Sequence, residues 1–253
     1  MKLLNALKID HTPGDTDTKA ECLSCGHKAM EVSNESPHQW QCWHCKATGN
    51  AYTIIQKFYE LLPSLKKEDA VWLRNLKPGT GLKAYRTAGV KPWKGTYVWP
   101  NYNQEGNITA LYTLLSFQED GKKKYRWNST PKPCSNPIIG LENLKSEGEI
   151  IVTEGHWDYN VALTHFNTKA SILGLCGSGF PARFLSILEN RPVYFLTDND
   201  EAGEAGVHSL AVKLKSGGTL PQFLAYINWG EITLPSGPPP NKCDIRDLAQ
   251  EYC

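Results

Sequence analysis

Apolar runs and helical stretches alternate through the last hundred residues of the chain. Four short runs rich in branched and aromatic residues have the length and composition of buried strands. They are Ile150–Thr153, Ser171–Leu175, Val193–Thr197 and Phe223–Ile227. Helical spacing of apolar positions lies between them, over Trp157–His165, Ala182–Glu189 and Ala202–Leu214. Because strands that alternate with helices form a mostly parallel sheet, residues 148–253 are predicted to be an α/β domain.

The middle of the chain has a different pattern, with two aromatic-rich runs that predict an antiparallel hairpin. Thr96–Trp99 and Ile108–Ser116 are strand-like, and residues 103–107 between them are typical of a turn. The preceding residues, 60–93, are helical in part but broken by proline and glycine, so they are predicted to connect two domains. Residues 94–147 are predicted to be a separate basic subdomain, which makes the whole chain an α+β multidomain protein.

Residues 1–59 are dominated by two Cys-x-x-Cys pairs. Cys22 and Cys25 form the first pair, Cys42 and Cys45 the second, and 16 residues separate them. This spacing is typical of a zinc ribbon, in which four thiolates hold one Zn²⁺ and leave no position open for catalysis. Three histidines lie close enough to substitute for a cysteine, but the four cysteines are the preferred set; the histidines are His27, His38 and His44. A short helix follows, over Ala51–Tyr59.

Composition adds limits on location and partners. The chain has 253 residues, 40% of them hydrophobic, and eight cysteines. No apolar run approaches the roughly 20 residues of a membrane span, and no secretion signal is evident, so a cytoplasmic protein is expected, in the host cytoplasm if it is viral. Net charge is +1, but residues 61–133 carry 13 Lys/Arg against 5 Asp/Glu, and residues 146–253 carry 7 against 13. The middle is therefore suited to polyanions and the end to cations, unless both are ordinary solvated surfaces.

Two clusters are candidates for binding nucleic acid. The segment from Lys122 to Ser129 combines cations with aromatic rings, which suits phosphates and base faces; its candidate residues are Lys122, Lys123, Lys124, Arg126 and Asn128. The second cluster surrounds the second cysteine pair and consists of Trp40, Trp43 and His44. The plain alternatives are a solvated loop for the lysines and packing against the metal site for the rings.

Carboxylates follow two of the predicted strands. Glu154 comes directly after the strand that begins at Ile150, and Asp198 and Asp200 follow the strand that begins at Val193. Ligands bind at the carboxyl edge of open α/β sheets, and carboxylate oxygens suit Mg²⁺ or Mn²⁺. The alternative for Asp198 is that it caps the helix that follows.

These motifs together resemble those of DnaG-type primases of bacteria and bacteriophages. The similar segments are Cys42–Ala51, Tyr97–Pro100, Glu105–Ile108, Lys124–Ser129, Ile139–Leu141, Glu154–Asp158, Asp198–Gly203 and Asp244–Leu248. Two of them, Glu154-Gly-x-x-Asp158 and Asp198-x-Asp200-x-Ala-Gly203, look like the signatures of a Toprim domain, a Rossmann-like α/β fold.

The resemblance implies a nucleotidyltransferase that makes RNA primers on single-stranded DNA during replication, from ribonucleoside triphosphates. It implies catalytic and metal-binding roles for Glu154, Asp198 and Asp200, and contacts to the nucleotide or the nucleic acid for Asp158 and Lys124. The arginine usual in that family near residues 111–114 is missing, and no helicase follows residue 253, so a separate helicase partner is expected.

Two rival readings also combine these modules. A RecR-like recombination mediator would bind DNA without catalysis, but it predicts a helix-hairpin-helix before its cysteines, and only about twenty residues precede Cys22 here. A Toprim nuclease or topoisomerase would cleave instead of synthesise, which the amino-terminal ribbon and the segment at Asn128 disfavour.

Overall fold

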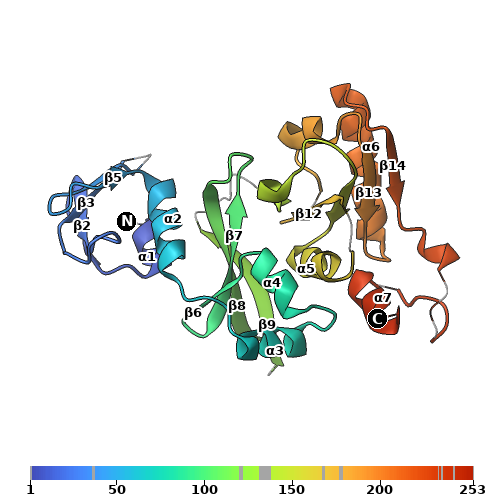
Figure 1. Ribbon diagram of the computed structural model, residues 1–253, viewed down its shortest axis with the longest axis horizontal. Coiled ribbons are helices and arrows are strands. Elements are labelled where there is room, and N and C mark those ends of the chain that lie inside the picture. The colour runs from blue at the N-terminus through green and yellow to red at the C-terminus, as the bar shows by residue number, and fades with distance from the viewer. Residues whose placement is uncertain are drawn as a thin grey trace. The chain divides into compact units, whose positions relative to one another are not determined.

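The computed structural model describes residues 2–35, 38–119, 122–130, 138–166, 169–176, 179–232, 234, 236–241 and 243–252. The chain divides into two compact units, each built from two separate stretches of sequence (Figure 1). Unit 1 comprises Met1–Ser64 and Val90–Asn136, and unit 2 comprises Leu65–Gly89 and Pro137–Cys253. The predicted division into four domains remains a prediction.

The first part of unit 1 is a small antiparallel sheet between two helices. The sheet has the order β1-β2-β3-β4-β5, with bounds His11–Thr12, Asp17–Ala20, Met30–Ser33, Trp40–Cys42 and Thr48–Gly49. Helix α1 (Lys2–Leu7) precedes it and α2 (Ala51–Leu61) follows. A capping box starts α2, because the Asn50 side chain accepts the N–H groups of Tyr52 and Thr53 while Thr53 Oγ1 accepts the N–H of Asn50. The helix predicted at this place is confirmed.

The second part of unit 1 is a four-stranded antiparallel meander. Its strands are β6 (Lys91–Trp93), β7 (Thr96–Tyr102), β8 (Ile108–Glu119) and β9 (Lys122–Thr130), in that order. The predicted hairpin is confirmed as β7 and β8, and the N–H of Asn103 donates to the carbonyl of Asn107 across its turn. The apolar face of α2 packs on β8, so the ribbon and the meander share one core.

Unit 2 is built on a five-stranded, mostly parallel sheet, as the sequence predicts. Its order is β10-β12-β11-β13-β14, with bounds Ile138–Ile139, Ser171–Leu175, Ile150–Thr153, Pro192–Leu196 and Phe223–Tyr226. Only β10 runs antiparallel. Helix α5 (His156–His165) covers one face, where Gly174 lets the Tyr159 side chain lie directly on β12. Helix α6 (Glu201–Gly217) and the 3₁₀ helix η2 (Ala182–Leu188) pack on the opposite face with Val152, Val193 and Phe195.

Three further α-helices and two short 3₁₀ helices complete unit 2. Helices α3 (Lys67–Leu76) and α4 (Leu82–Thr87) lie within residues 60–93, which the sequence predicts to be a connector, and α4 packs on α5. Helix α7 (Ile245–Tyr252) also packs on α5. The short 3₁₀ helices η1 (Leu141–Asn143) and η3 (Trp229–Glu231) lie beside the sheet. Among the described residues, no helix is long and apolar enough to cross a membrane.

Candidate metal centres and nucleic-acid interface

The four cysteines of the ribbon converge as predicted. The Sγ atoms of Cys22 and Cys45 are 3.8 Å apart and those of Cys25 and Cys42 are 3.7 Å apart, with all four within 4.8 Å of one another. Four sulfurs placed tetrahedrally at about 2.3 Å from Zn²⁺ would be separated by about 3.8 Å, so the donor set fits this ion. The distances are too long for disulfides, which join sulfurs at about 2.05 Å.

Backbone groups prepare these sulfurs for a cation. The N–H of Ser24 donates to Cys22 Sγ at 3.4 Å and that of Cys45 donates to Cys42 Sγ at 3.5 Å. The donation from Cys45 is the main reason why the pKa of the Cys42 thiol falls to about 6. The prediction of a four-cysteine zinc site is therefore confirmed, and the site is structural because its coordination shell is closed.

The three rings predicted to stack on bases differ in exposure. Trp43 is 55% exposed, and His44 is exposed and stacks on His27 with ring centroids 3.5 Å apart. Trp40 is only 4% exposed, and its Nε1 donates to Thr53 Oγ1. This corrects the expectation for Trp40, whose ring lies in the ribbon core because its strand position points toward α2.

The basic segment predicted to contact nucleic acid lies in strand β9 and not in a loop. β9 pairs with β8 along its whole length, and Asn128 is half-buried opposite Thr113. The side chains of Lys122, Lys123, Lys124 and Arg126 lie outside the described part of the structure. Their role stays a prediction.

The carboxylates in unit 2 lie where the chain path of the sheet reverses direction. From β11 the chain goes through α5 to β12 on one side, whereas β13 lies on the other side and leads through α6 to β14. Glu154 follows β11 and Asp198 follows β13, so they stand at the carboxyl ends of adjacent parallel strands. This crevice is the usual ligand position in open α/β sheets.

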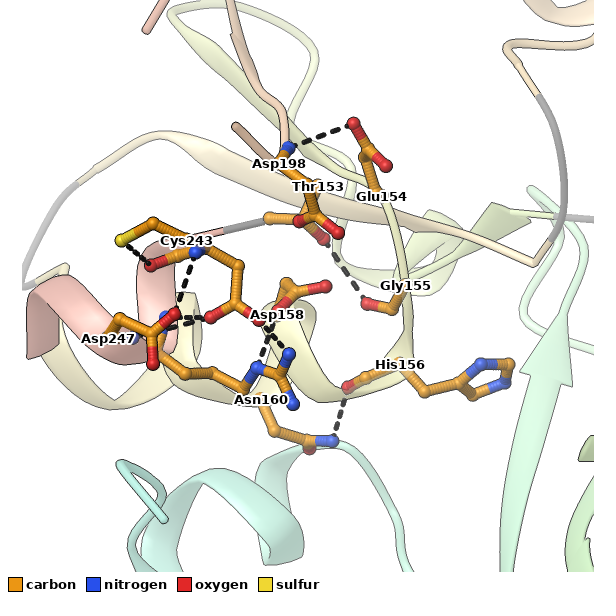
Figure 2. Close-up of polar contacts among 11 residues, drawn as sticks. Thr153, Glu154, Gly155, His156, Asp158, Asn160, Asp198, Cys243 and Asp247 are labelled. Carbon is orange, nitrogen blue, oxygen red and sulfur yellow. Dashed lines mark hydrogen bonds and ion pairs between the residues drawn. The ribbon is translucent and has the colours of Figure 1, made fainter. Parts of the chain in front are cut away.

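Glu154 and Asp198 are held together by a direct contact. Glu154 Oε1 accepts the backbone N–H of Asp198 at 3.0 Å (Figure 2). Gly203 lets the first turn of α6 approach them: a Cβ at this position would lie 2.3 Å from the Asp198 carbonyl oxygen and 3.1 Å from Glu154 Oε1. The glycine of the second sequence motif is therefore required by close packing.

Asp200, and not Asp198, caps helix α6. Its Oδ1 accepts the N–H of Gly203 at 2.9 Å. The helix-capping role considered for Asp198 therefore belongs to Asp200. Capping engages one oxygen of Asp200 and leaves the second with no part in the cap, and Asp200 also lines the cavity beside β13 and β14.

A second charged group lies next to these carboxylates and includes residues that the motifs did not assign. Arg246 Nε lies 3.3 Å from Asp158 Oδ1, and its terminal nitrogen contacts Asp244. Asp247 Oδ2 accepts the N–H of Asp244 at 2.9 Å. Lys77, which ends α3, is close enough for Arg246, Asp158 and Asp198 to influence its pKa. Lys77 and the pairing of Arg246 with Asp158 were missed because these residues lie far from their partners in sequence.

Burial opposes the ionisation of this acidic group. It raises the pKa of Glu154 to about 7 and that of Asp198 above its usual range. Burial also raises the pKa of Asp158 to about 6, although Arg246 opposes the shift. For Lys77, burial lowers the pKa, and Arg246 adds to that effect. A bound cation would stabilise the ionised form of these desolvated carboxylates.

The donor chemistry fits a hard divalent cation, while the spacing is loose. The oxygens of Glu154, Asp198 and Asp200 do not form a group within 4.8 Å of one another, in contrast to the four cysteines. Mg²⁺ typically binds one or two carboxylates and completes its shell with water and substrate phosphates. These three residues would hold such an ion together with those ligands.

Comparison with known proteins places this arrangement in a class of folds. No protein-family model and no curated sequence matches the chain. Among solved structures, the zinc-binding and RNA polymerase domains of the Aquifex aeolicus primase align with 100% of this chain and 80% of that one, at 16% identity and a TM-score of 0.50. The DnaG catalytic core aligns with 79% of this chain and 76% of that one, at 13% identity and a TM-score of 0.55.

A DNA primase domain from Pseudomonas aeruginosa gives the same picture, with 79% of this chain and 74% of that one aligned at 14% identity and a TM-score of 0.55. The chain therefore has the fold of a zinc ribbon joined to a primase-type RNA polymerase domain. That fold is the one of DnaG-type primases, which confirms the resemblance seen in the sequence.

Proposed function

We propose that this protein is a DNA primase that synthesises short RNA primers on single-stranded DNA during replication. The observation that carries the proposal is the set of desolvated carboxylates at the reversal point of the parallel sheet, in a chain with the fold of DnaG-type primases. In this proposal unit 2 contains a Toprim domain, and Glu154, Asp198 and Asp200 form its catalytic centre.

The reaction joins the 3′-hydroxyl of one ribonucleotide to the α-phosphate of the next and releases pyrophosphate. Bound Mg²⁺ or Mn²⁺ would supply positive charge to the phosphate oxygens and lower the pKa of the hydroxyl. Glu154 Oε1 is engaged with the Asp198 N–H, so we assign Oε2 to accept the hydroxyl proton.

Lys77 and Arg246 give this centre its own positive charge. They lie beside Asp158 and Asp198 and are placed to neutralise phosphate oxygens of the incoming triphosphate. Arg246 also keeps Asp158 oriented through their ion pair. In phosphoryl transfer, positioning and charge neutralisation account for most of the rate enhancement.

The ribbon and strand β9 are assigned to the template. Trp43 and the stacked pair of His44 and His27 expose rings on which unpaired bases can stack. Cations of β9, with Asn128, are assigned to phosphates of the template or of the nucleotide. A replicative helicase is the expected protein partner.

The test is incubation of the protein with single-stranded DNA of mixed sequence, labelled ribonucleotides and Mg²⁺ or Mn²⁺, with products resolved on a gel. Short RNA chains are expected from the wild type, and their yield should fall by about two orders of magnitude or more in Asp198→Asn and Asp200→Asn. Fluorescence anisotropy of labelled DNA should show template binding retained in both variants. Binding without synthesis by the wild type would favour a RecR-like clamp, and cleaved DNA would favour a nuclease or topoisomerase.

A further inference from the structure

A cavity opens on the β14 side of the acidic centre, and of its lining residues only Asp198 and Asp200 have a role in the function proposed above. Its volume is about 520 Å³, within the range of about 300 to 1,000 Å³ typical of small-molecule sites. It lies at the carboxyl ends of β13 and β14, which are adjacent parallel strands, and helix α6 also lines it.

The two walls of the cavity come from different elements. Helix α6 contributes Glu204, Val207 and His208, which follow one another at the helical spacing that places side chains on one face. The other wall is the chain from Tyr226 to Gly230. Trp229 anchors this wall, because its ring is buried and its Nε1 donates to the carbonyl of Thr197 at 3.0 Å.

The lining is chemically divided from one end to the other. Asp198 and Asp200 belong both to the cavity and to the proposed catalytic centre. Away from them the lining holds the Tyr226 ring, which is 59% exposed, and the carboxamide of Asn228. An exposed aromatic ring can stack on a base, and an amide can form hydrogen bonds with a base edge. A carboxylate can accept hydrogen bonds from ribose hydroxyls.

We propose that this cavity binds one ribonucleotide, with its base against Tyr226, its ribose hydroxyls at Glu204 and its phosphates toward Asp198 and Asp200. This inference rests on the proposed primase function and extends it to a nucleotide subsite. Three carboxylates in the lining repel phosphates, so binding requires a divalent cation. The occupant is either a free triphosphate or the terminal nucleotide of the RNA primer, and the two sources share the same chemistry.

The first experiment measures binding by fluorescence titration with 2-aminopurine riboside triphosphate and Mg²⁺. Tyr226→Ala should raise the dissociation constant about tenfold, because base stacking on an aromatic ring is lost. Tyr226→Phe keeps the ring and should stay within about twofold of the wild type. Phe223→Ala is the matched control, since Phe223 is also an exposed aromatic residue of β14 (43% exposed) but does not line the cavity.

The second experiment tests the ribose contact by competition between ATP and dATP. The wild type should prefer ATP, and Glu204→Ala should reduce that preference toward equality. A parallel titration with an RNA–DNA hybrid that carries 2-aminopurine at its RNA 3′ end separates the two sources. If Tyr226→Ala loses affinity only for the triphosphate, the cavity binds the incoming nucleotide. If it loses affinity only for the hybrid, the cavity binds the end of the primer.

The outcomes also separate this inference from the proposed function. If the wild type makes RNA but Tyr226→Ala binds both probes as the wild type does, the cavity is not a nucleotide subsite and the function stands. If the wild type binds the triphosphate in a Tyr226-dependent way but makes no RNA, the subsite stands and the primase proposal fails. Circular dichroism of each variant verifies that it is folded.

Discussion

At the residue scale, the acidic centre depends on one position without a side chain. Gly203 occupies the first turn of α6, where a Cβ would meet the Asp198 carbonyl at 2.3 Å, a backbone atom that cannot rotate away. Gly206 lies one turn later in the same helix, and the nearest atom to a Cβ there is Phe195 Cε1 at 3.8 Å. A side chain is therefore excluded at Gly203 but accommodated at Gly206, a difference that the sequence alone does not reveal.

Gly203→Ala should destabilise the fold by about 1 to 3 kcal/mol, because the helix must move away from the two carboxylates. Primer synthesis should fall with it, since Glu154 and Asp198 lose their spacing. Gly206→Ala should be neutral or stabilising by about 0.5 to 1 kcal/mol, as expected for alanine in an open helical position. Urea denaturation of both variants measures the difference, and equal effects would contradict the packing argument.

Glu154 should make stability depend on pH when no divalent cation is present. Its folded-state pKa is about 7, above the ordinary value of 4.5, so the folded state holds the proton more tightly. The stability from this proton is present below pH 4.5 and is lost as pH rises to about 7. Glu154→Gln should therefore raise the melting temperature relative to wild type at pH 8 but not at pH 4.

The same pair of proteins tests the cation site without an activity measurement. Mg²⁺ should raise the melting temperature of the wild type at pH 8 by mass action and have a smaller effect on Glu154→Gln. An equal Mg²⁺ effect in both proteins would show that the ion does not use this carboxylate.

At the element scale, the sequence predicts the strands and helices well but not the neighbours that they acquire. The runs that begin at Ile150 and Val193 become parallel strands, because a strand covered by helices on both faces is apolar at every position. The sequence pattern does not distinguish Trp40 from Trp43, since both lie beside the second cysteine pair. Trp40 is buried because α2 packs on it, whereas Trp43 has no such cover and stays exposed. Likewise, Lys77 joins the acidic centre through tertiary packing alone.

The lysines of strand β9 are predicted to contact phosphates of the template. Replacing Lys122, Lys123 and Lys124 with alanine should weaken template binding and reduce the slope of log affinity against log salt by about 2, because single-stranded DNA releases about 0.7 counterions per phosphate neutralised. Lys66, Lys67 and Lys83 are exposed lysines on or beside α3 and α4 and provide the control triple variant. The same slope in both triple variants would mean that β9 is an ordinary solvated strand.

At the scale of the whole molecule, the zinc site supports more than the ribbon. Ile54 and Ile55 of α2 belong to one core cluster with Val98, Ile108 and Leu111 of the meander. A ribbon of this size depends on its metal for folding, so loss of zinc should expose this core and loosen β7 and β8 as well. The core of unit 2 is a separate cluster and should persist.

Cys42→Ser should therefore lose zinc and the protection of unit 1 amides in hydrogen exchange, while unit 2 amides remain protected. Initiation on single-stranded DNA should be abolished. Extension of a supplied RNA primer should continue at a reduced rate, because Glu154, Asp198 and Asp200 are in the intact unit. Equal loss of both activities with unit 2 still protected would place the ribbon within the catalytic apparatus itself.

The interleaving of the two units has a consequence for synthesis on the ribosome. Leu65–Gly89 belongs to unit 2, yet it leaves the ribosome before the meander and well before α5, on which α4 packs. At about 5 to 20 residues per second, the roughly 75 residues from Gly89 to the end of α5 require about 4 to 15 s, during which α4 has no partner surface from α5. The nascent chain therefore presents an apolar helical hairpin to chaperones during that interval, and any expression fragment that starts after Gly89 leaves the matching surface of α5 uncovered.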